Sequence, residues 1–150
     1  MNRSALIVGA GSGLSSSLAL QCANLGMDVA LAARNIEKLE DLGRQTAASL
    51  HKCDASKFED VNRLFKDLDE KLGIPELVVY NPSARLRGSI ESLDPEKTKE
   101  ALDVTCFGAF LVAQQAAKRM LKRGSGSIFF TGASAGVKGF ANSSVFAMGK

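Results

Sequence analysis

Short apolar runs alternate with amphipathic segments along the chain. Such runs are typical of strands that are buried on both faces of a sheet. Five are predicted: Ala5–Val8, Asp28–Ala33, His51–Asp54, Glu76–Asn81 and Ser127–Thr131. The run at 51–54 is the weakest, and we include it mainly because the alternation requires a strand there.

The segments between the runs carry apolar residues at three- or four-residue spacing, which predicts helices with one buried face. The helical positions are Leu14, Leu18, Cys22 and Leu25; Ile36, Leu39 and Leu42; Phe58, Val61, Leu64, Phe65, Leu68 and Leu72, a predicted buried stripe; and the apolar or tolerated positions Ala101, Leu102, Thr105, Phe110, Leu111 and Val112. Asn35 is predicted to cap the second helix, and Ser56 with Glu59 to form a capping box at the third. Asp94, followed by Pro95, begins a long helix that runs to about residue 122.

A further helix is predicted to begin near Val145. Alternating strands and helices predict right-handed crossovers and a doubly wound parallel sheet, an α/β fold of the Rossmann type in a single domain over 1–150. In this architecture, ligands bind beyond the carboxyl ends of the strands. We therefore expect five segments to converge on one crevice: Gly9–Gly13, Ala33–Arg34, Asp54, Asn81 and Gly132–Ser134.

A glycine-rich turn follows the first strand directly. The spacing G-x-G-x-x-G fails because Leu14 stands at its last position, whereas G-x-x-x-G-x-G is met except for Ser15. The alternative is an ordinary flexible turn between strand and helix. We favour a dinucleotide site, because such a turn directs free backbone N–H groups and the helix dipole at a pyrophosphate. The predicted cofactor contacts here are Gly9, Gly11, Ser12, Gly13 and Leu14.

The end of the second strand indicates which cofactor binds. An acidic residue there accepts from the ribose 2′-hydroxyl of NAD, but this chain has Arg34 and no acid. A guanidinium can grip a 2′-phosphate with paired hydrogen bonds, which favours NADP(H). The alternative is a surface arginine at a helix start. Asp54 is a candidate acceptor for the adenine amine or only a turn residue, and Asn81 is predicted to contact the cofactor at the fourth strand end.

Composition excludes several other function classes. The chain has 150 residues, a net charge of +3 and 45% hydrophobic residues, as expected for one globular domain. Its basic cluster closes a predicted helix, and no basic stripe with interleaved aromatics predicts nucleic-acid binding. Three scattered cysteines and one histidine predict no metal site and suggest buried thiols in a reducing compartment. No signal peptide or membrane span is predicted, so we expect a cytoplasmic protein.

The chain resembles the short-chain dehydrogenase/reductase family from Leu6 to Lys150. The matching segments are Val8-Gly9-x-x-x-Gly13-Leu14, Cys53-Asp54, Val79-Tyr80-Asn81-Pro82-Ser83-Ala84, Asp103-Val104-Thr105-x-x-Gly108, Gly126-Ser127-Ile128 and Phe146-x-x-x-Lys150. The resemblance implies hydride transfer between a nicotinamide and a carbonyl. It also implies a homodimer or homotetramer built partly on the long helix from Pro95. Family members usually continue well beyond this lysine, so we expect 1–150 to be the N-terminal part of a longer domain, with Ile128 and Phe130 poorly covered.

The family's catalytic residues carry over only in part. Lys150 matches the lysine that holds the ribose and lowers the tyrosine pKa. Phe146 stands at the tyrosine position, Ala133 at the serine position and Thr105 at the asparagine position. Ser134, one residue beyond the expected serine, is the remaining catalytic candidate, although its side chain is expected to point elsewhere unless the loop is irregular.

Other groups near the strand ends are weaker candidates. Tyr80 is expected to be a packed aromatic, Ser143 and Ser144 to be loop serines, and the arginines at 85 and 87 to be solvated rather than contacts for an acidic substrate. The sequence thus predicts an NADP(H)-dependent oxidoreductase for a small carbonyl or hydroxyl compound, with altered catalytic residues. The alternatives are an NADP(H)-binding pseudoenzyme and a structural subunit that binds nothing.

Overall fold

The computed structural model describes residues 3–150 and contains the predicted parallel sheet. Its five strands lie in the order β3-β2-β1-β4-β5, and all neighbours are parallel. The strands are β1 (Ser4–Val8), β2 (Asp28–Ala33), β3 (Ser49–Lys52), β4 (Leu77–Tyr80) and β5 (Ser127–Phe130). The chain builds outward from β1 on one side and then returns to β4 on the other. The strand order therefore reverses between β1 and β4, which confirms the doubly wound α/β fold.

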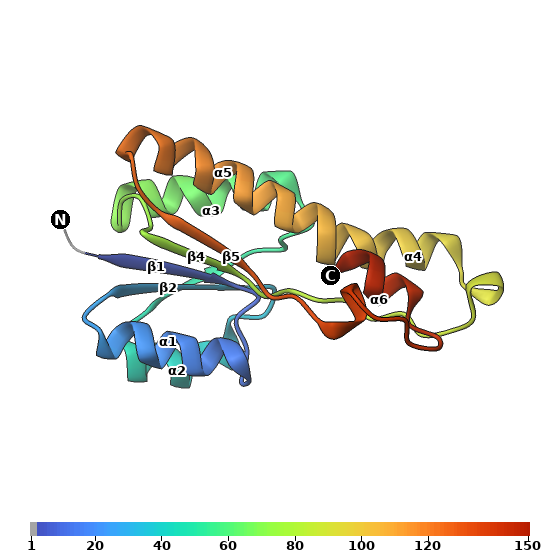
Figure 1. Cartoon of the computed structure of the whole chain (residues 1–150). Helices are drawn as coiled ribbons and strands as arrows, with labels where there is room; N and C mark the ends of the chain where they lie inside the picture. Colours follow the sequence, from blue (N-terminus) through green and yellow to red (C-terminus); the bar gives the residue numbers. More distant parts are fainter. Residues whose placement is uncertain (1–2) are drawn as a thin grey trace.

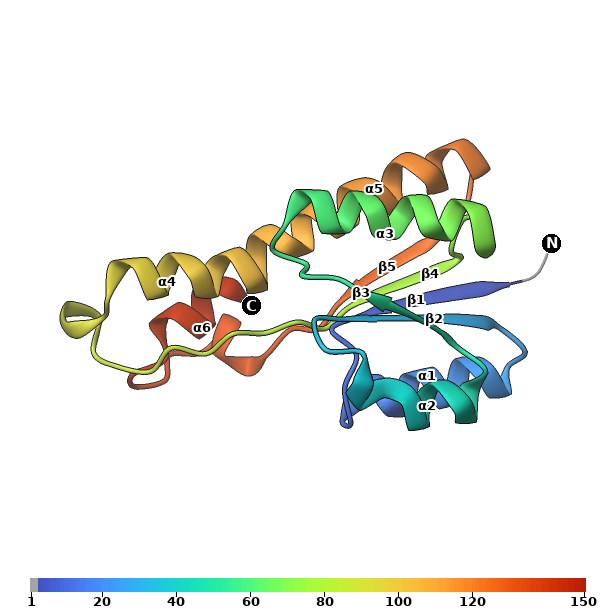
Figure 2. The ribbon, with the colours of Figure 1, turned by 180° about the vertical axis from the view of Figure 1, so that it is seen from behind.

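Helices cover both faces of the sheet. They are α1 (Leu14–Asn24), α2 (Glu40–Thr46), α3 (Phe58–Lys71), α4 (Pro95–Leu102), α5 (Gly108–Arg123) and α6 (Ser144–Gly149). In Figure 1, α1 and α2 lie on one face and α3 and α5 on the other. Figure 2 shows the same layers from behind, with α4 and α6 forming an extension beyond the carboxyl ends of the strands.

The central strand β1 explains why its sequence is an unbroken apolar run. Leu6 and Val8 belong to the core under α3 and α5, whereas Ala5 and Ile7 belong to the core under α1 and α2. Successive side chains of a strand point to opposite faces, so a strand covered on both sides needs apolar residues at every position.

The buried face of α1 differs from the predicted one. Ser15, Ala19 and Cys22 are buried, whereas Leu14 and Leu25 are 54% and 58% exposed. Small side chains let this helix lie close to the sheet under the glycine turn, and that close approach rotates the leucines outward. Phe58, which was predicted to be buried on the third helix, is also exposed, as is Phe110 on the long helix.

The third strand begins two residues earlier than predicted. It spans Ser49–Lys52, and His51 pairs with Ala32. Cys53 and Asp54 therefore follow the strand, with the Cys53 N–H donating to Ala33 O at 3.0 Å. Polar residues occupy this strand because it lies at the edge of the sheet, where one side is uncovered.

The capping box predicted at α3 is wrong. The N-cap is Lys57, without a side-chain cap, and the Ser56 hydroxyl instead donates to Asp54 Oδ1 at 2.7 Å. The Asp54 carboxylate also accepts the Ser56 N–H at 3.0 Å, so a tight turn before the helix uses the serine. The predicted role of Asn35 is closer, since its Oδ1 accepts the Glu37 N–H at 3.1 Å at the start of a 3₁₀ turn that precedes α2.

The long helix predicted from Pro95 contains a wide turn. Asp94 caps it as predicted, accepting from Lys97 N, and Gly124 ends it with a φ of 79°. Between α4 and α5, however, Asp103–Phe107 forms a π-helical segment. The Tyr80 hydroxyl donates to the Val104 carbonyl in this segment, and a Cβ at Gly108 would lie 2.3 Å from that hydroxyl oxygen. Gly108 thus lets the helix approach the end of β4.

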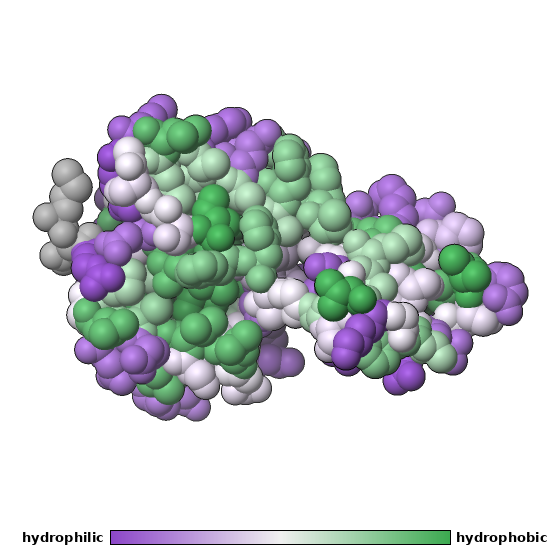
Figure 3. Space-filling view, viewed as in Figure 1, coloured by the Kyte–Doolittle hydropathy of each residue, from purple (hydrophilic) through white to green (hydrophobic). Residues whose placement is uncertain are grey.

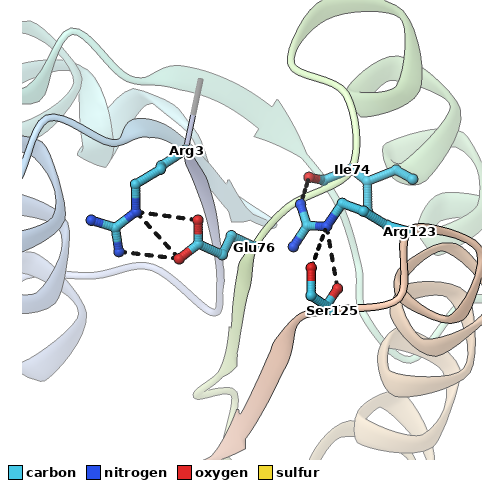
Figure 4. A network of polar contacts seen from close by, with 5 residues as sticks. All are labelled: Arg3, Ile74, Glu76, Arg123 and Ser125. Atoms are coloured by element: carbon cyan, nitrogen blue, oxygen red, sulfur yellow. Dashed lines mark hydrogen bonds and ion pairs between the residues drawn. The ribbon is translucent and has the colours of Figure 1, made fainter. Parts of the chain in front are cut away.

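Polar contacts tie the strands together at their amino ends. Arg3, next to β1, pairs with Glu76, next to β4, at 3.1 Å. Arg123 at the end of α5 donates to Ile74 O at 2.8 Å and to Ser125 O at 3.2 Å (Figure 4). These contacts lie at the amino-terminal ends of the strands, whereas the predicted ligand crevice lies at their carboxyl ends.

Part of the molecular surface near β5 is apolar. Figure 3 shows apolar side chains gathered there, and Phe129 and Phe130 on β5 are 60% and 55% exposed. The expectation that Phe130 is poorly covered is confirmed, whereas Ile128 is partly buried against the core. Among residues 3–150, no helix is both long enough and apolar enough to span a membrane.

Candidate functional site

A hollow of about 420 Å³ lies at the carboxyl ends of β1, β2, β3 and β4. Its lining includes Gly9, Arg34, Asp54 and Asn81, one from each of four predicted segments. The fifth segment, at the end of β5, does not line this hollow. The predicted convergence is therefore confirmed for four strand ends and wrong for the fifth, which borders a separate hollow.

The glycine turn at the end of β1 has room for only a glycine at its first position. Gly9 has a φ of 76°, and a Cβ there would lie 2.5 Å from Pro82 N. The Gly9 N–H donates to Ala32 O at 2.9 Å, which holds the turn against β2. Gly11 and Gly13 differ, because a Cβ at either position would point into open space.

Ser15, which stands where the sequence pattern has a glycine, connects the turn to β4. Its hydroxyl donates to Gly9 O at 3.2 Å and accepts from Asn81 Nδ2 at 2.8 Å. The side chain is almost completely buried. Sequence reasoning noted Ser15 only as a departure from the glycine pattern and did not predict that it contacts both Gly9 and Asn81.

The turn presents unused hydrogen-bond donors. Within residues 3–150, the backbone N–H groups of Gly11 and Ser12 have no acceptor. Both residues line a small groove beside the main hollow. Leu14 begins α1, so the positive end of that helix dipole faces the same region.

Two cations line the main hollow near the end of β2. Arg34 was predicted, whereas Lys38, one turn further along the chain, was not. In the described part of the chain, neither makes a hydrogen bond or an ion pair. Lys38 also lines the groove with Gly11 and Ser12, so it lies between the arginine and the glycine turn. The four-residue spacing from Arg34 was the only sequence signal for it.

Asp54 lines the main hollow, but one of its oxygens is occupied. Its Oδ1 accepts from both the N–H and the hydroxyl of Ser56. The turn role proposed as the alternative is therefore present. Its Oδ2 has no partner within residues 3–150, which leaves one oxygen for a ligand.

The second hollow, of about 400 Å³, joins the segments that follow β4 and β5. It is lined by Ala133, Ser134 and Phe146, together with Arg85 and Arg87. The residues at the family's serine and tyrosine positions thus share one cavity. Ser134 reaches the same cavity because a 3₁₀ turn at Ser134–Gly136 makes the loop irregular.

Lys150 lies beside this hollow without lining it. Its Nζ donates to Thr131 O at 2.9 Å and lies 5.9 Å from the centre of the Phe146 ring. Burial lowers the pKa of this ammonium group, and the nearby Arg85 lowers it further. The lysine is thus held at the end of β5, next to the aromatic residue.

Thr105 and Tyr80 have structural contacts. The Thr105 hydroxyl accepts the Ala84 N–H at 3.0 Å and fastens the loop after β4 to the π-helical segment. Tyr80 is buried, and burial raises its pKa strongly, which makes its hydroxyl a poor proton donor to a substrate. The expectation of a packed tyrosine is confirmed.

Cysteine and histidine give no metal site within residues 3–150. Cys22 and Cys53 are buried as expected, but Cys106 is exposed on the π-helical segment. The expectation of three buried thiols is therefore wrong for Cys106, because the π-helical turn directs that residue outward.

Comparison with known proteins identifies the family. The family model described as short chain dehydrogenase matches residues 3–150. The chain belongs to the short-chain dehydrogenase/reductase family. A farnesol dehydrogenase of Aedes aegypti is 32% identical over 79% of this chain and 51% of its own length. A 3-oxoacyl-[acyl-carrier-protein] reductase of Bos taurus is 27% identical over 100% of this chain and 64% of its own length.

Two solved structures, one of them a short-chain type dehydrogenase/reductase, have the same fold as this chain. One from Mycobacterium marinum gives a TM-score of 0.92 at 27% identity, covering 99% of this chain and 63% of its own. A variant of the actinorhodin polyketide ketoreductase with NADPH gives 0.94 at 24% identity, covering 99% of this chain and 59% of its own. The chain thus spans about half to two thirds of the length of these relatives.

Proposed function

We propose that this chain forms the cofactor-binding part of an NADP(H)-dependent oxidoreductase that acts on a small carbonyl or hydroxyl compound. The observation that supports it most strongly is the main hollow with its adjoining groove, where the free backbone N–H groups of the glycine turn lie close to two unpaired cations, Arg34 and Lys38. The dinucleotide would lie across the reversal of strand order, as in other doubly wound folds.

The residues of the hollow fit the cofactor by position and chemistry. The N–H groups of Gly11 and Ser12 would bind the pyrophosphate, where the missing Cβ atoms of Gly11 and Gly13 leave open space. Arg34 and Lys38 would hold the 2′-phosphate. Asp54 Oδ2, which has no partner within residues 3–150, would accept from the adenine amine, and Lys150 would hold the nicotinamide ribose.

The acid–base groups are altered in this proposal. Bound NADPH supplies a hydride, so the protein must still orient the substrate and provide a proton. Phe146 has no exchangeable proton, and a general acid is typically worth about 10²–10⁴ in rate. The Ser134 hydroxyl, which lies in the same cavity, would orient a carbonyl or a water there. We therefore expect slow turnover relative to family members with a tyrosine.

A pseudoenzyme that binds NADP(H) without turnover is the second candidate. The Arg85 guanidinium carbon lies 4.4 Å from the centre of the Phe146 ring. It therefore covers a ring face that a substrate would contact if position 146 took part in catalysis. Steady-state reduction of a panel of carbonyl compounds with NADPH separates the two candidates. Turnover supports the enzyme, and its absence alongside tight NADPH binding supports the pseudoenzyme.

The cofactor proposal is tested by titration with NADPH and NADH. In Arg34→Ala and Lys38→Ala, NADPH affinity should fall by about 10- to 100-fold, as expected for lost hydrogen bonds to a charged group. NADH affinity should hardly change. Lys66→Ala, an exposed lysine on α3, is the matched control. Equal affinity of the wild type for both nucleotides would overturn the NADP(H) assignment.

We also propose a homo-oligomer built on the long helix. Phe107 and Phe110 are both exposed on it, with ring centres 6.0 Å apart, and form an apolar patch. Light scattering should show a dimer or tetramer, and Phe110→Glu should shift it toward monomer. A monomeric wild type would contradict this assembly.

A further inference from the structure

The second hollow is positively charged, although most of its lining residues other than the two arginines are apolar. Arg85 and Arg87 are its only ionisable lining residues, and neither makes a hydrogen bond or ion pair within residues 3–150. Lys150 adds a third positive charge beside Phe146. In the described part of the chain, no carboxylate lines the cavity or pairs with either arginine.

One ring contact restrains the Arg85 side chain, and two hydrogen bonds from backbone N–H groups hold its loop. Its guanidinium carbon lies over the Phe146 ring, and a cation–π contact of this kind restrains the side chain while leaving all its N–H groups free. The loop that carries it is held by the Ala84 N–H bond to Thr105 and by the Gly88 N–H, which donates to Asn142 O at 3.3 Å. Figure 1 shows this loop running beside the segment that leads into α6.

The Phe146 side chain suits this arrangement. Its ring supplies a flat apolar surface for a guanidinium, which Arg stacks on more readily than Lys because its charge is planar and weakly hydrated. Phe146 and Arg85 thus form one local structure, although a ring with a hydroxyl could offer the same face. The Ser134 and Ser143 hydroxyls complete the polar groups of the wall.

We propose that this hollow is an anion subsite, and that the substrate is a small carbonyl or hydroxyl compound that also carries a carboxylate. The carboxylate would bind the Arg85 guanidinium through paired hydrogen bonds, with Arg87 adding charge at the rim. This proposal rests on the proposed function, because it specifies the substrate of the same site. The cavity volume accommodates a molecule of a few carbon atoms.

Calorimetric titration of the full chain with 3-oxobutanoate and with 3-oxobutanamide tests this subsite. The two probes have nearly the same shape, and only the first carries a charge. The wild type should bind the anion at least about tenfold more tightly than the amide, as charge-assisted hydrogen bonds predict. Arg85→Gln should remove this difference, and Arg85→Lys should keep only part of it because it loses the paired geometry and the stacking.

Arg44→Gln is the matched control. This exposed arginine lies on α2, where it pairs with Asp41, and α2 covers the face of the sheet opposite to α5 (Figure 1). Equal binding of the two probes to the wild type would overturn the subsite, as would an unchanged preference in Arg85→Gln. The same loss in Arg44→Gln would also overturn it by revealing a general charge effect. NADPH binding is titrated separately. A failure of the cofactor proposal is therefore distinguishable from a failure of the subsite proposal.

Discussion

The two hollows at the carboxyl edge of the sheet are built from different parts of the polypeptide. The main hollow and its adjoining groove depend largely on backbone geometry, namely the Gly9 turn, the free N–H groups and the order of the strands, with side chains such as Arg34 added at the rim. The second hollow depends on side-chain chemistry, because Phe146, Ala133 and Arg85 determine which proton donors, hydrogen-bond donors and charges line it. A backbone site is retained whenever the fold forms, whereas a side-chain site changes its chemistry with single residues.

The largest expected effect comes from restoring the family's side chains in the second hollow. Phe146→Tyr combined with Ala133→Ser should raise kcat/KM for carbonyl reduction by about 10²–10⁴, because a hydroxyl next to Lys150 can supply a proton. Steady-state kinetics with NADPH measures it. Phe140→Tyr, in the same hollow but on the loop, should give no such gain. If the wild type turns over but the double variant shows no gain in activity, the chemistry takes place elsewhere.

The next effect separates the two kinds of glycine in the turn. Gly9→Ala should lower the free energy of unfolding by about 3 kcal/mol, because its Cβ would meet Pro82 in a left-handed backbone. Gly11→Ala should leave stability almost unchanged and lower NADPH affinity instead. Urea denaturation and nucleotide titration measure the two quantities. Equal destabilisation by both variants would show that the turn is not divided in this way.

A smaller effect is expected where the sheet meets the long helix. Tyr80→Phe should lower the free energy of unfolding by about 1–3 kcal/mol, because it leaves the Val104 carbonyl without its partner. NADPH affinity should not change, since this hydroxyl is packed away from the main hollow. Urea denaturation measures the first quantity, and a loss of NADPH affinity at full stability would contradict the packing role.

The smallest effect is a pH dependence of stability. Burial of His51 lowers its pKa, which outweighs the opposing effect of Asp67 and is reinforced by Lys71, while its Nε2 lies 2.9 Å from Ser49 Oγ. The unfolded chain then binds more protons below its ordinary pKa, so stability should fall as the pH drops through about 6.5. Thermal unfolding at pH values from about 7.5 to about 5.5, a range that brackets the ordinary pKa of histidine, measures this change in stability. His51→Gln should flatten the curve, and an equally steep curve for this variant would assign the effect to other groups.

The fold could be predicted from sequence because hydrophobic periodicity and glycine positions act locally. The elements that were predicted wrongly depend on tertiary contacts instead. Hydropathy favoured Leu14 and Leu25 for the buried face of α1, but close contact with the sheet required Ser15 and Ala19. The start of β3 was missed because an edge strand tolerates polar residues.

The site was predictable to the same extent. Arg34 and the glycine turn follow local motifs, and both line or border the main hollow. Lys38 carries no motif, and its place in the main hollow depends on the 3₁₀ turn that contains it. Arg85 and Phe146 lie 61 positions apart in sequence, and only the packing of two loops brings them together.

The outward position of Cys106 has a practical consequence. Thiolates react with maleimides, and burial raises the pKa of Cys22 and raises that of Cys53 to about 12, so both are protected. A single fluorescent label can therefore be attached at position 106 without engineering the other cysteines. Since the neighbouring Thr105 holds the loop after β4, such a dye would report directly on movements of that loop when a compound enters.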